Sequence, residues 1–233
     1  MDFSDTTVVI PALEEPGLWE VVAKTRKALP GAEILVLWKG YNDRAPKFKE
    51  KGVRAIKQES RGKGTVIIQV QRHRYVKTEI ICFIDGDATY EPKDFIGLIG
   101  KVRKGYGMAL GNRFARLDRR SMPEFIEFGN KVITVVANVL YFMWLRDSQT
   151  GIRAIRTSAF QSLDLREKGF GIESEMNIKM RKSGYRLVEL PARYYVRVGE
   201  SKQMKVIDGL RLLGIDFKFL FYRPGPAVGR GRN

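Results

Sequence analysis

Short apolar runs alternate with longer amphipathic stretches through the first half of the chain. The apolar runs are rich in β-branched residues, as expected of buried strands. They cover residues 6–10, 34–38, 53–56, 80–84 and 108–110. Three of the intervening stretches place apolar residues at helical spacing among Lys and Arg, at 18–29, 65–73 and 93–104. Strands that alternate with helices predict an α/β fold, a mostly parallel, doubly wound sheet flanked by helices.

The second half is expected to contain a helix at 123–145, a strand at 152–155, a helix at 171–184, a β-rich segment at 187–198 and an amphipathic stretch at 206–222. The apolar run 132–145 is too short to span a bilayer, and we interpret it as a buried core helix rather than a membrane-contacting one. With no linker before Pro224, residues 1–222 are predicted to form one domain. The Pro/Gly/Arg-rich residues 223–233 are predicted to be a disordered tail.

Net charge narrows the set of partners. A formal charge of +16 predicts a polyanionic neighbour, which can be nucleic acid, an anionic membrane surface or a phosphorylated substrate. No zinc-knuckle, RNP-like or repeated basic-aromatic motif is present, so no specific nucleic-acid partner is expected. The single cysteine, Cys82, lies within an apolar run and is expected to be buried, which fits a reducing cytosol. The first residues are not expected to form a signal peptide.

Two carboxylates follow the fourth apolar run. Asp85 and Asp87 are separated by Gly86, so an extended backbone points both side chains the same way. Ligands of open α/β sheets lie beyond the carboxyl ends of the strands. Paired carboxylates suit Mg²⁺ or Mn²⁺ that also holds a diphosphate. The alternative interpretation is an ordinary Asp-Gly-Asp turn.

Cationic residues gather at two further places. Lys63, between two glycines before a predicted helix, is suited to phosphate oxygens, although a flexible basic turn is an equal alternative. A predicted loop at 114–123 is dense in arginine, whose planar fork matches phosphate oxygens. The arginines in and beside it are Arg113, Arg116, Arg119 and Arg120.

Four motifs, taken in order, resemble those of the family-2 glycosyltransferases of the GT-A fold, and most of all the subgroup that includes dolichol-phosphate mannose synthase. They read VIPALEE at 9–15, RGKG at 61–64, DGDA at 85–88 and RVGESK at 197–202. The resemblance covers about residues 8–202. It implies a single GT-A domain with a C-terminal amphipathic helix. It also implies metal-dependent, inverting transfer of a sugar from a nucleoside-diphosphate sugar.

The resemblance also implies site residues. The metal would be held by Asp85 and Asp87. The donor nucleotide would be bound by Pro11, Ala12, Glu14, Asp43, Lys63, Asp85, Asp87, Arg197 and Lys202. The chain departs from the family where the second strand ends, because Trp38 and Lys39 replace two aspartates that contact the base and ribose. The Asn that usually precedes the paired glutamates is also missing. The donor therefore stays open between GDP-mannose and a UDP-sugar.

The pKa of the attacking group helps to distinguish the possible acceptors. A phosphate monoester, with a second pKa of about 6, is already mostly ionised near pH 7 and needs cations rather than a base. The four arginines at 113–120 supply such cations, which favours a polyprenyl or dolichyl phosphate. A hydroxyl acceptor would need a base, for which Asp147 and Glu173 are the candidates. Their alternative roles are a loop cap and a favourable charge at a helix N-terminus. The predicted catalytic residues are Asp87, Asp147 and Arg113.

A lipid acceptor implies contact with a membrane. Basic residues near anionic headgroups contribute about 1 kcal/mol each, and the amphipathic segment 210–221 can add interfacial burial. Packing of that segment on the core or in a homodimer is the alternative. We expect a cytoplasmic protein bound peripherally to the membrane. The competing function class is a catalytically inactive, basic polyanion-binding module, against which the retained DxD motif argues.

Overall fold

The strands of the described chain form one sheet. The computed structural model describes residues 1–40, 46–48, 51–197 and 206–224, without the side chains of 206–208 and 210. The strands are β1 (Thr6–Leu13), β2 (Glu33–Lys39), β3 (Val53–Lys57), β4 (Ile80–Phe83), β5 (Met108–Leu117), β6 (Arg153–Arg156) and β7 (Leu187–Tyr194). Their order is β3-β2-β1-β4-β6-β5-β7. Only β6 runs antiparallel to its neighbours, β4 and β5. The prediction of a mostly parallel α/β sheet is confirmed.

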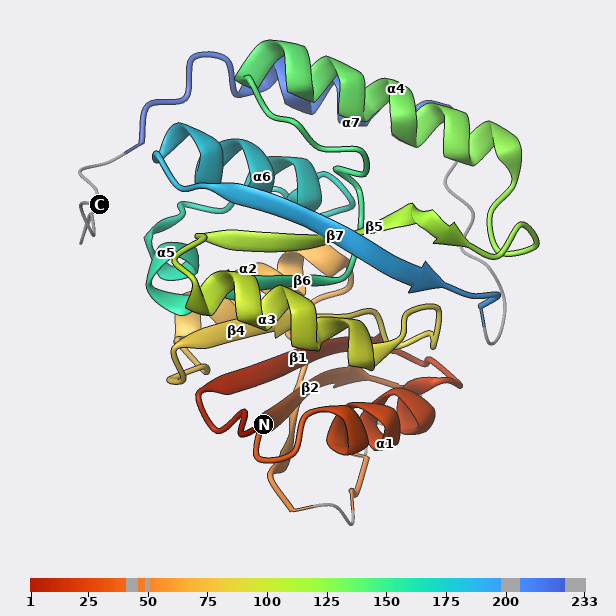
Figure 1. The fold of residues 1–233 in the computed structure, drawn as a ribbon, viewed down its shortest axis with the longest axis vertical. Helices are drawn as coiled ribbons and strands as arrows, with labels where there is room; N and C mark the ends of the chain where they lie inside the picture. The colour runs from red at the N-terminus through yellow and green to blue at the C-terminus, as the bar shows by residue number, and fades with distance from the viewer. Residues whose placement is uncertain (41–45, 49–50, 198–205, 225–233) are drawn as a thin grey trace.

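Helices cover both faces of this sheet (Figure 1). They are α1 (Leu18–Ala28), α2 (Lys63–His73), η1 (Pro92–Asp94), α3 (Phe95–Arg103), α4 (Glu124–Tyr141), α5 (Thr157–Ser162), α6 (Ile172–Lys182) and α7 (Val206–Lys218). Helices α1 and α3 pack on one face, while α2, α4, α5 and α6 pack on the other. Helix α7 lies along α4 at the top of the view in Figure 1.

Strand periodicity explains the two cores. Along β1, Val8 and Ile10 pack toward α1 and α3, whereas Val9 packs toward α2. Such alternation follows from the two-residue repeat of a strand. Each of these three side chains has 0% exposure, so both faces of β1 are buried. A central parallel strand is therefore apolar throughout, as the continuous run in the sequence predicts.

The structure differs from the predicted elements in several places. β1 continues through Pro11 to Leu13, and the short helix α5 was not predicted. β5 extends to Leu117, so Arg113 and Arg116 lie in a strand rather than in an arginine loop. Pairing with β7, shifted in register between Asn112 and Arg116, holds this polar end of β5 in the sheet.

The interpretation of α4 as a buried core helix is wrong. Its inner side buries Ile133, Ala137 and Tyr141. Its outer side exposes Val135 and Val139 by 59% and 69%. Because apolar residues occupy both sides, the sequence pattern does not distinguish this helix from a fully buried one. Within the described parts of the chain, α4 and the other helices all lack the length and apolar character needed to cross a bilayer.

Helix α7 carries a buried carboxyl, that of Asp216. Asp216 is fully buried, and its carboxylate forms no ion pair among the described residues. The Tyr141 hydroxyl donates to the Asp216 carbonyl instead. Burial raises the pKa of the Asp216 side chain from 3.8 to about 7, and the nearby Ser174 hydroxyl offsets this only in part. The folded protein therefore favours the protonated carboxyl.

We expect the free energy of unfolding to fall as pH rises from about 4 to above 7. The folded state holds a proton in this window that the unfolded state, with a pKa near 3.8, has released. Asp216→Asn should flatten this dependence, because the amide mimics the neutral acid. Urea titrations at several pH values check this. Equal pH dependence in the wild type and the variant would show that Asp216 is not the responsible group.

Candidate active site

The candidate site lies where the strand order reverses. β2 and β4 flank β1 on opposite sides, so the loops after β1 and β4 diverge and leave a crevice. Asp85 and Asp87 lie in the turn that follows β4, and Glu14 and Glu15 lie in the loop that follows β1. Asp85 and Asp87, predicted to lie at the mouth of a site, both line the cavities described below.

One lysine joins two carboxylates at the floor of the crevice. Lys63 Nζ lies 2.6 Å from Asp85 Oδ1 and 2.7 Å from Glu173 Oε1. Lys63 begins α2 and Glu173 lies in the first turn of α6, so the network joins β4 to two helices. Burial alone would lower the pKa of Lys63, but Asp85 and then Glu173 outweigh it and raise the pKa. The lysine is therefore a fixed cation.

Asp87 faces a second cation. Arg197 Nη1 lies 3.3 Å from Asp87 Oδ2, and Arg197 Nη2 lies 2.6 Å from Glu15 Oε2. The Thr89 hydroxyl and backbone N–H also donate to Asp87 Oδ1. Burial, followed by the nearby Asp85 charge, raises the pKa of Asp87 although Thr89 and Arg197 act against this. A further positive charge between Asp85 and Asp87 would relieve their repulsion.

The backbone around these carboxylates is unusual. Ala88 and Glu14 have positive φ angles of 61° and 52°, a conformation that non-glycine residues rarely adopt. Strain of this kind gathers at functional sites. Gly151 is packed against Asp85 so closely that an added Cβ would overlap the carboxylate. A glycine at 151 therefore lets Asp85 and Lys63 meet.

Two cavities share this centre. Lys63, Asp85, Asp87, Phe170 and Arg197 line both. The first cavity extends along the loop after β1 and the start of α2, and is also lined by Pro11, Gly62, Val66 and Gly86. The second cavity extends toward α4 and α7, and is also lined by Tyr90, Arg113, Asn130, Glu173, Tyr194 and Leu212. The arrangement has room for two reactants that meet at Asp85 and Asp87.

Arg113 is the notable cation of the second cavity. Its Nε and Nη2 each donate to Asp147 at 2.7 Å, and its backbone N–H donates to the same carboxylate at 3.0 Å. Asp147 has 0% exposure and does not line the cavity. Burial alone would lower the pKa of Arg113, but Asp147 more than offsets this and holds the pKa well above its usual value. Among the described residues, no acceptor binds the remaining nitrogen, Nη1.

The other predicted acceptor residues lie elsewhere. Arg119 pairs with Glu127, and Arg120 pairs with Asp118, with the two arginine side chains 77% and 84% exposed. Arg116 is exposed on β5. None of the three lines the second cavity, so the structure brings only Arg113 of the predicted four to it.

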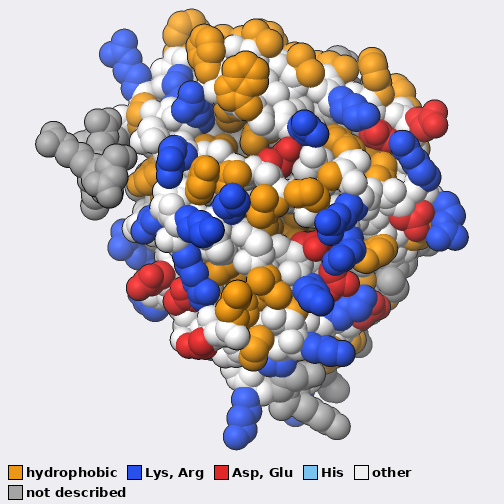
Figure 2. All heavy atoms as spheres, viewed as in Figure 1, with side chains coloured by type: hydrophobic (Ala, Val, Ile, Leu, Met, Phe, Trp, Pro, Cys, Tyr) orange, Lys and Arg blue, Asp and Glu red, His pale blue; other side chains and the backbone are white. Residues whose placement is uncertain are grey.

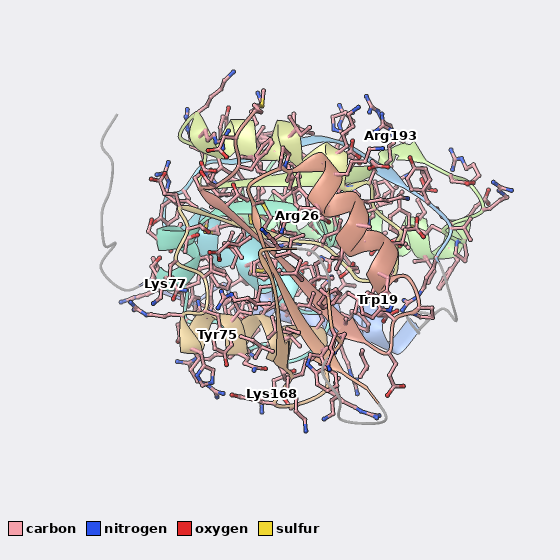
Figure 3. The ribbon with its side chains drawn as sticks, turned by 90° about the horizontal axis from the view of Figure 1, so that it is seen from below. Trp19, Arg26, Tyr75, Lys77, Lys168 and Arg193 are labelled. Atoms are coloured by element: carbon pink, nitrogen blue, oxygen red, sulfur yellow. The ribbon has the colours of Figure 1, made fainter. Side chains whose placement is uncertain are left out.

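Predicted donor residues fall into three groups. Pro11, Lys63 and Arg197 line the first cavity, together with the paired aspartates. Ala12 and Glu14 line a neighbouring hollow at the ends of β1 and β2, where Trp38 and Lys39 also lie. Figure 3 labels Trp19, a further wall of this hollow, at the start of α1. Asp43 and Lys202 lie outside the described residues.

Several residues at the site were not predicted. Phe170 lines both cavities, and Tyr90 and Tyr194 line the second, where their rings meet edge to face. Gln58 is buried and donates to the carbonyls of Ala12 and Leu37, which ties β1 to β2 at the first cavity. No motif marks these positions. Of these residues, only Tyr90 could have been suspected from the sequence, because it follows Asp87 closely.

The carboxylates suit a divalent cation that a ligand helps to hold. Among the described residues, no three His, Cys, Asp or Glu side chains are grouped to hold a metal by themselves. Asp85 and Asp87 provide two oxygen ligands at the junction of the cavities. Mg²⁺ and Mn²⁺ take oxygen ligands and are commonly shared between one or two carboxylates and substrate phosphates. The donor set fits such a shared cation.

Known proteins resemble this chain over most of its length. Residues 7–163 match the family described as Glycosyl transferase family 2. The chain is 30% identical over 194 residues to Glycosyltransferase AglJ of Haloferax volcanii, covering 82% of this chain and 63% of that protein. It is 28% identical over 206 residues to the dolichyl-phosphate hexose transferase of the same organism, covering 86% and 87%. It spans 51% of a further Haloferax relative, the hexosyltransferase Agl6.

A solved structure shares the architecture. Glucosyl-3-phosphoglycerate synthase from Mycobacterium tuberculosis, in complex with Mn²⁺, uridine diphosphate and phosphoglyceric acid, superposes with a TM-score of 0.70 at 17% identity. The match covers 97% of this chain and 81% of that chain. At this identity the likeness establishes the fold alone, which is the GT-A fold predicted from the motifs. With the match over residues 7–163, the chain belongs to glycosyl transferase family 2.

Proposed function

We propose that this protein is a metal-dependent, inverting glycosyltransferase that moves a sugar from a nucleoside-diphosphate sugar to a polyprenyl phosphate. One observation carries the proposal: Arg113, fixed by Asp147, lines a cavity that begins at Asp85 and Asp87. A cation at this place suits a phosphate acceptor beside the donor diphosphate. Relatives named dolichyl-phosphate hexose transferase and dolichol-phosphate mannosyltransferase support this acceptor class.

The first cavity is proposed to bind the donor. Asp85 and Asp87 would hold Mg²⁺ or Mn²⁺ together with diphosphate oxygens, and such a cation neutralises the charge that develops on the departing diphosphate. Lys63 and Arg197 contribute further positive charge at the same junction. The nucleobase is proposed to occupy the neighbouring hollow lined by Ala12, Glu14, Trp38 and Lys39. GDP-mannose and UDP-sugars are both retained as donors, and titration with GDP and UDP distinguishes them.

The proposed transfer forms one bond and breaks another. An oxygen of the acceptor phosphate attacks the anomeric carbon from the side opposite the diphosphate, and the bonding electrons leave with the diphosphate. Because the attacking phosphate is already ionised near pH 7, no proton has to be removed. Asp147 is then not needed as a base, and its proposed role is to position Arg113. The polyprenyl tail keeps the acceptor in a membrane, so the reaction is proposed to take place at a membrane surface.

A hydroxyl acceptor is the second candidate. It is favoured by Glu173, whose Oε2 has no hydrogen-bond partner among the described residues although the residue is only 3% exposed. Glu173 lines the second cavity, and its unpaired Oε2 is the proposed acceptor of a proton from a sugar hydroxyl. Under the phosphate hypothesis, Glu173 instead fixes Lys63.

Arg113→Lys is expected to test the phosphate hypothesis. A lysine retains the positive charge beside Asp147 but loses the fork that can bind a carboxylate and a phosphate together. We expect kcat/KM for polyprenyl phosphate to fall by about tenfold or more, as expected for losing a charged hydrogen bond. The donor Kd, measured by calorimetry, should stay unchanged.

Arg103→Lys provides the matched control. Arg103 also pairs with an aspartate through Nε and Nη2, but neither Arg103 nor its partner Asp5 lines either cavity. This variant should leave kcat/KM unchanged. If Arg113→Lys weakens donor binding as much as turnover, Arg113 belongs to the donor site and the proposed acceptor assignment fails.

A further inference from the structure

The outer side of α4 and the chain just after it carries an unusual apolar surface. We define the α4 apolar surface as seven side chains that are each at least 36% exposed. They are Phe125, Phe128, Val132, Val135, Val139, Phe142 and Trp144. Most follow a spacing of three and four residues, so they form one stripe along the helix. Figure 2 shows hydrophobic side chains gathered along the upper edge of the molecule, where α4 lies in Figure 1.

A helix that faces water normally carries charged or polar residues on its outer side. On α4, however, Phe125, Phe128 and Val139 are 61%, 66% and 69% exposed, and just after the helix Phe142 and Trp144 are 73% and 92% exposed. Scattered exposed apolar residues are ordinary, whereas a contiguous stripe marks an interaction site. Helix α7 packs along α4, and the segment after α7 exposes a further apolar side chain, Phe221, by 91%.

We propose that the α4 apolar surface docks on the interfacial region of an anionic lipid bilayer. Aromatic residues stand toward both ends of the stripe and valines occupy its middle, a composition suited to the boundary between headgroups and acyl chains. Charge favours an anionic surface. The chain as a whole carries a formal charge of +16, although α4 itself holds Glu124 and Glu127 against Lys131. Glu127 pairs with both Lys131 and Arg119, which offsets its charge at this surface.

The position of the surface gives the second argument. Ile126 and Asn130 of the same helix line the second cavity, as does Leu212 of α7. One side of α4 therefore forms the wall of the proposed acceptor cavity, and the adjoining side is the apolar surface. This argument rests on the proposed function, because a phosphate in that cavity with a long apolar tail needs an apolar medium close to the opening. The exposed stripe itself is independent of any activity.

Paired substitutions in the middle of the stripe test the proposal. Val135→Ser/Val139→Ser makes the centre polar, whereas Val135→Leu/Val139→Leu keeps it apolar at the same exposed positions. Flotation of the full chain with phosphatidylcholine–phosphatidylglycerol vesicles is measured at low salt and at about 0.5 M salt, where screening acts within roughly 4–5 Å. Wild type and the Leu pair should stay bound at high salt. The Ser pair should lose at least about tenfold in vesicle partitioning there, since apolar burial is not screened.

Duplex DNA supplies a polyanion control, because its binding by phosphate contacts should be lost at the higher salt. If salt releases the wild type from vesicles as completely as it releases it from DNA, the proposal is overturned. Vesicle binding of the Ser pair equal to that of the wild type overturns it as well. The proposal is also overturned if the wild type is a dimer that does not bind vesicles and the Ser pair is a monomer. The apolar surface would then be a contact between two copies.

Transfer assays with the acceptor either embedded in vesicles or free in solution test the docking proposal and the proposed function separately. With polyprenyl phosphate embedded in vesicles, the Ser pair should lose transfer by the same factor as it loses vesicle binding. With a short-chain polyprenyl phosphate in solution, its transfer should equal that of the wild type. Loss of transfer in both formats would mean that α4 acts on the site and not as a docking surface. Absence of transfer in the wild type with intact vesicle binding would contradict the proposed function alone.

Discussion

Asp87→Asn is expected to lower turnover by about 10²–10³-fold, the scale seen when one preorganised electrostatic group is removed from a transition state. The asparagine oxygen can still accept the two hydrogen bonds from Thr89 that shape the turn. What disappears is the negative charge that would share a divalent cation with Asp85. We therefore expect the fold to be unchanged and the cation dependence of nucleotide binding to vanish.

Calorimetric titration with nucleotide, with Mn²⁺ or with chelator, measures this effect directly. Asp164→Asn is the control, because Asp164 is an exposed carboxylate that pairs, among the described residues, with Arg166 alone and does not line either cavity. Wild-type nucleotide affinity that is equal with Mn²⁺ and with chelator would contradict the assignment of Asp85 and Asp87 as cation ligands.

Asp147→Ala is expected to reduce the free energy of unfolding by about 3–5 kcal/mol, because removing one partner of a buried ion pair leaves the other charge uncompensated. Asp147 has 0% exposure and accepts three hydrogen bonds from Arg113, so the alanine variant leaves a buried guanidinium without its acceptor. Asp147→Asn should cost less, since its amide oxygen still accepts from Arg113.

Urea denaturation with an unchanged m-value checks this loss of stability. The comparison is Asp164→Ala, which removes an exposed ion pair expected to contribute about 0–1 kcal/mol. If Asp147→Ala costs no more than Asp164→Ala, the Arg113–Asp147 pair does not hold Arg113 in place, and its proposed positioning role fails.

Short sequence patterns were enough to point to Asp85, Asp87 and Lys63, the residues at the junction of the two cavities. Five apolar residues before Asp85 indicate a buried strand, and ligands of open sheets lie beyond such strands. The glycine-flanked Lys63 was expected at a helix start near phosphate, and it begins α2 and lines both cavities. These features depend on a few neighbouring residues, so the sequence alone reveals them.

Features that depend on distant residues were not predictable in this way. Glu173 reaches Lys63 only because α6 packs beside α2 in the fold. Arg113 is buried because Asp147, far along the chain, supplies its counter-charge. A dense run of arginines favours an exposed loop, and the pairing of β5 with β7 overrides that preference.

The net charge of the chain does not locate its binding surface. The composition predicts a polyanionic partner but not which surface binds that partner. Figure 3 shows Lys77, Lys168 and Arg193 at the rim of the molecule, so basic residues are not confined to the site. The apolar run at 132–145 was assigned to the core because its length excludes a membrane span. Only the packing of α4 reveals that one side of it lacks a partner within the described chain.

The most direct test of the central claim is a side-by-side transfer assay with polyprenyl phosphate and the matching polyprenol, using one nucleotide-sugar donor with Mn²⁺ or Mg²⁺ and then with chelator. The two acceptors differ only in the phosphate group, which Arg113 is proposed to bind and which makes a base unnecessary. We predict transfer to the phosphate, none to the alcohol, and loss of transfer with chelator. Equal transfer to the alcohol, abolished by Glu173→Gln, would contradict the phosphate acceptor and favour the hydroxyl alternative.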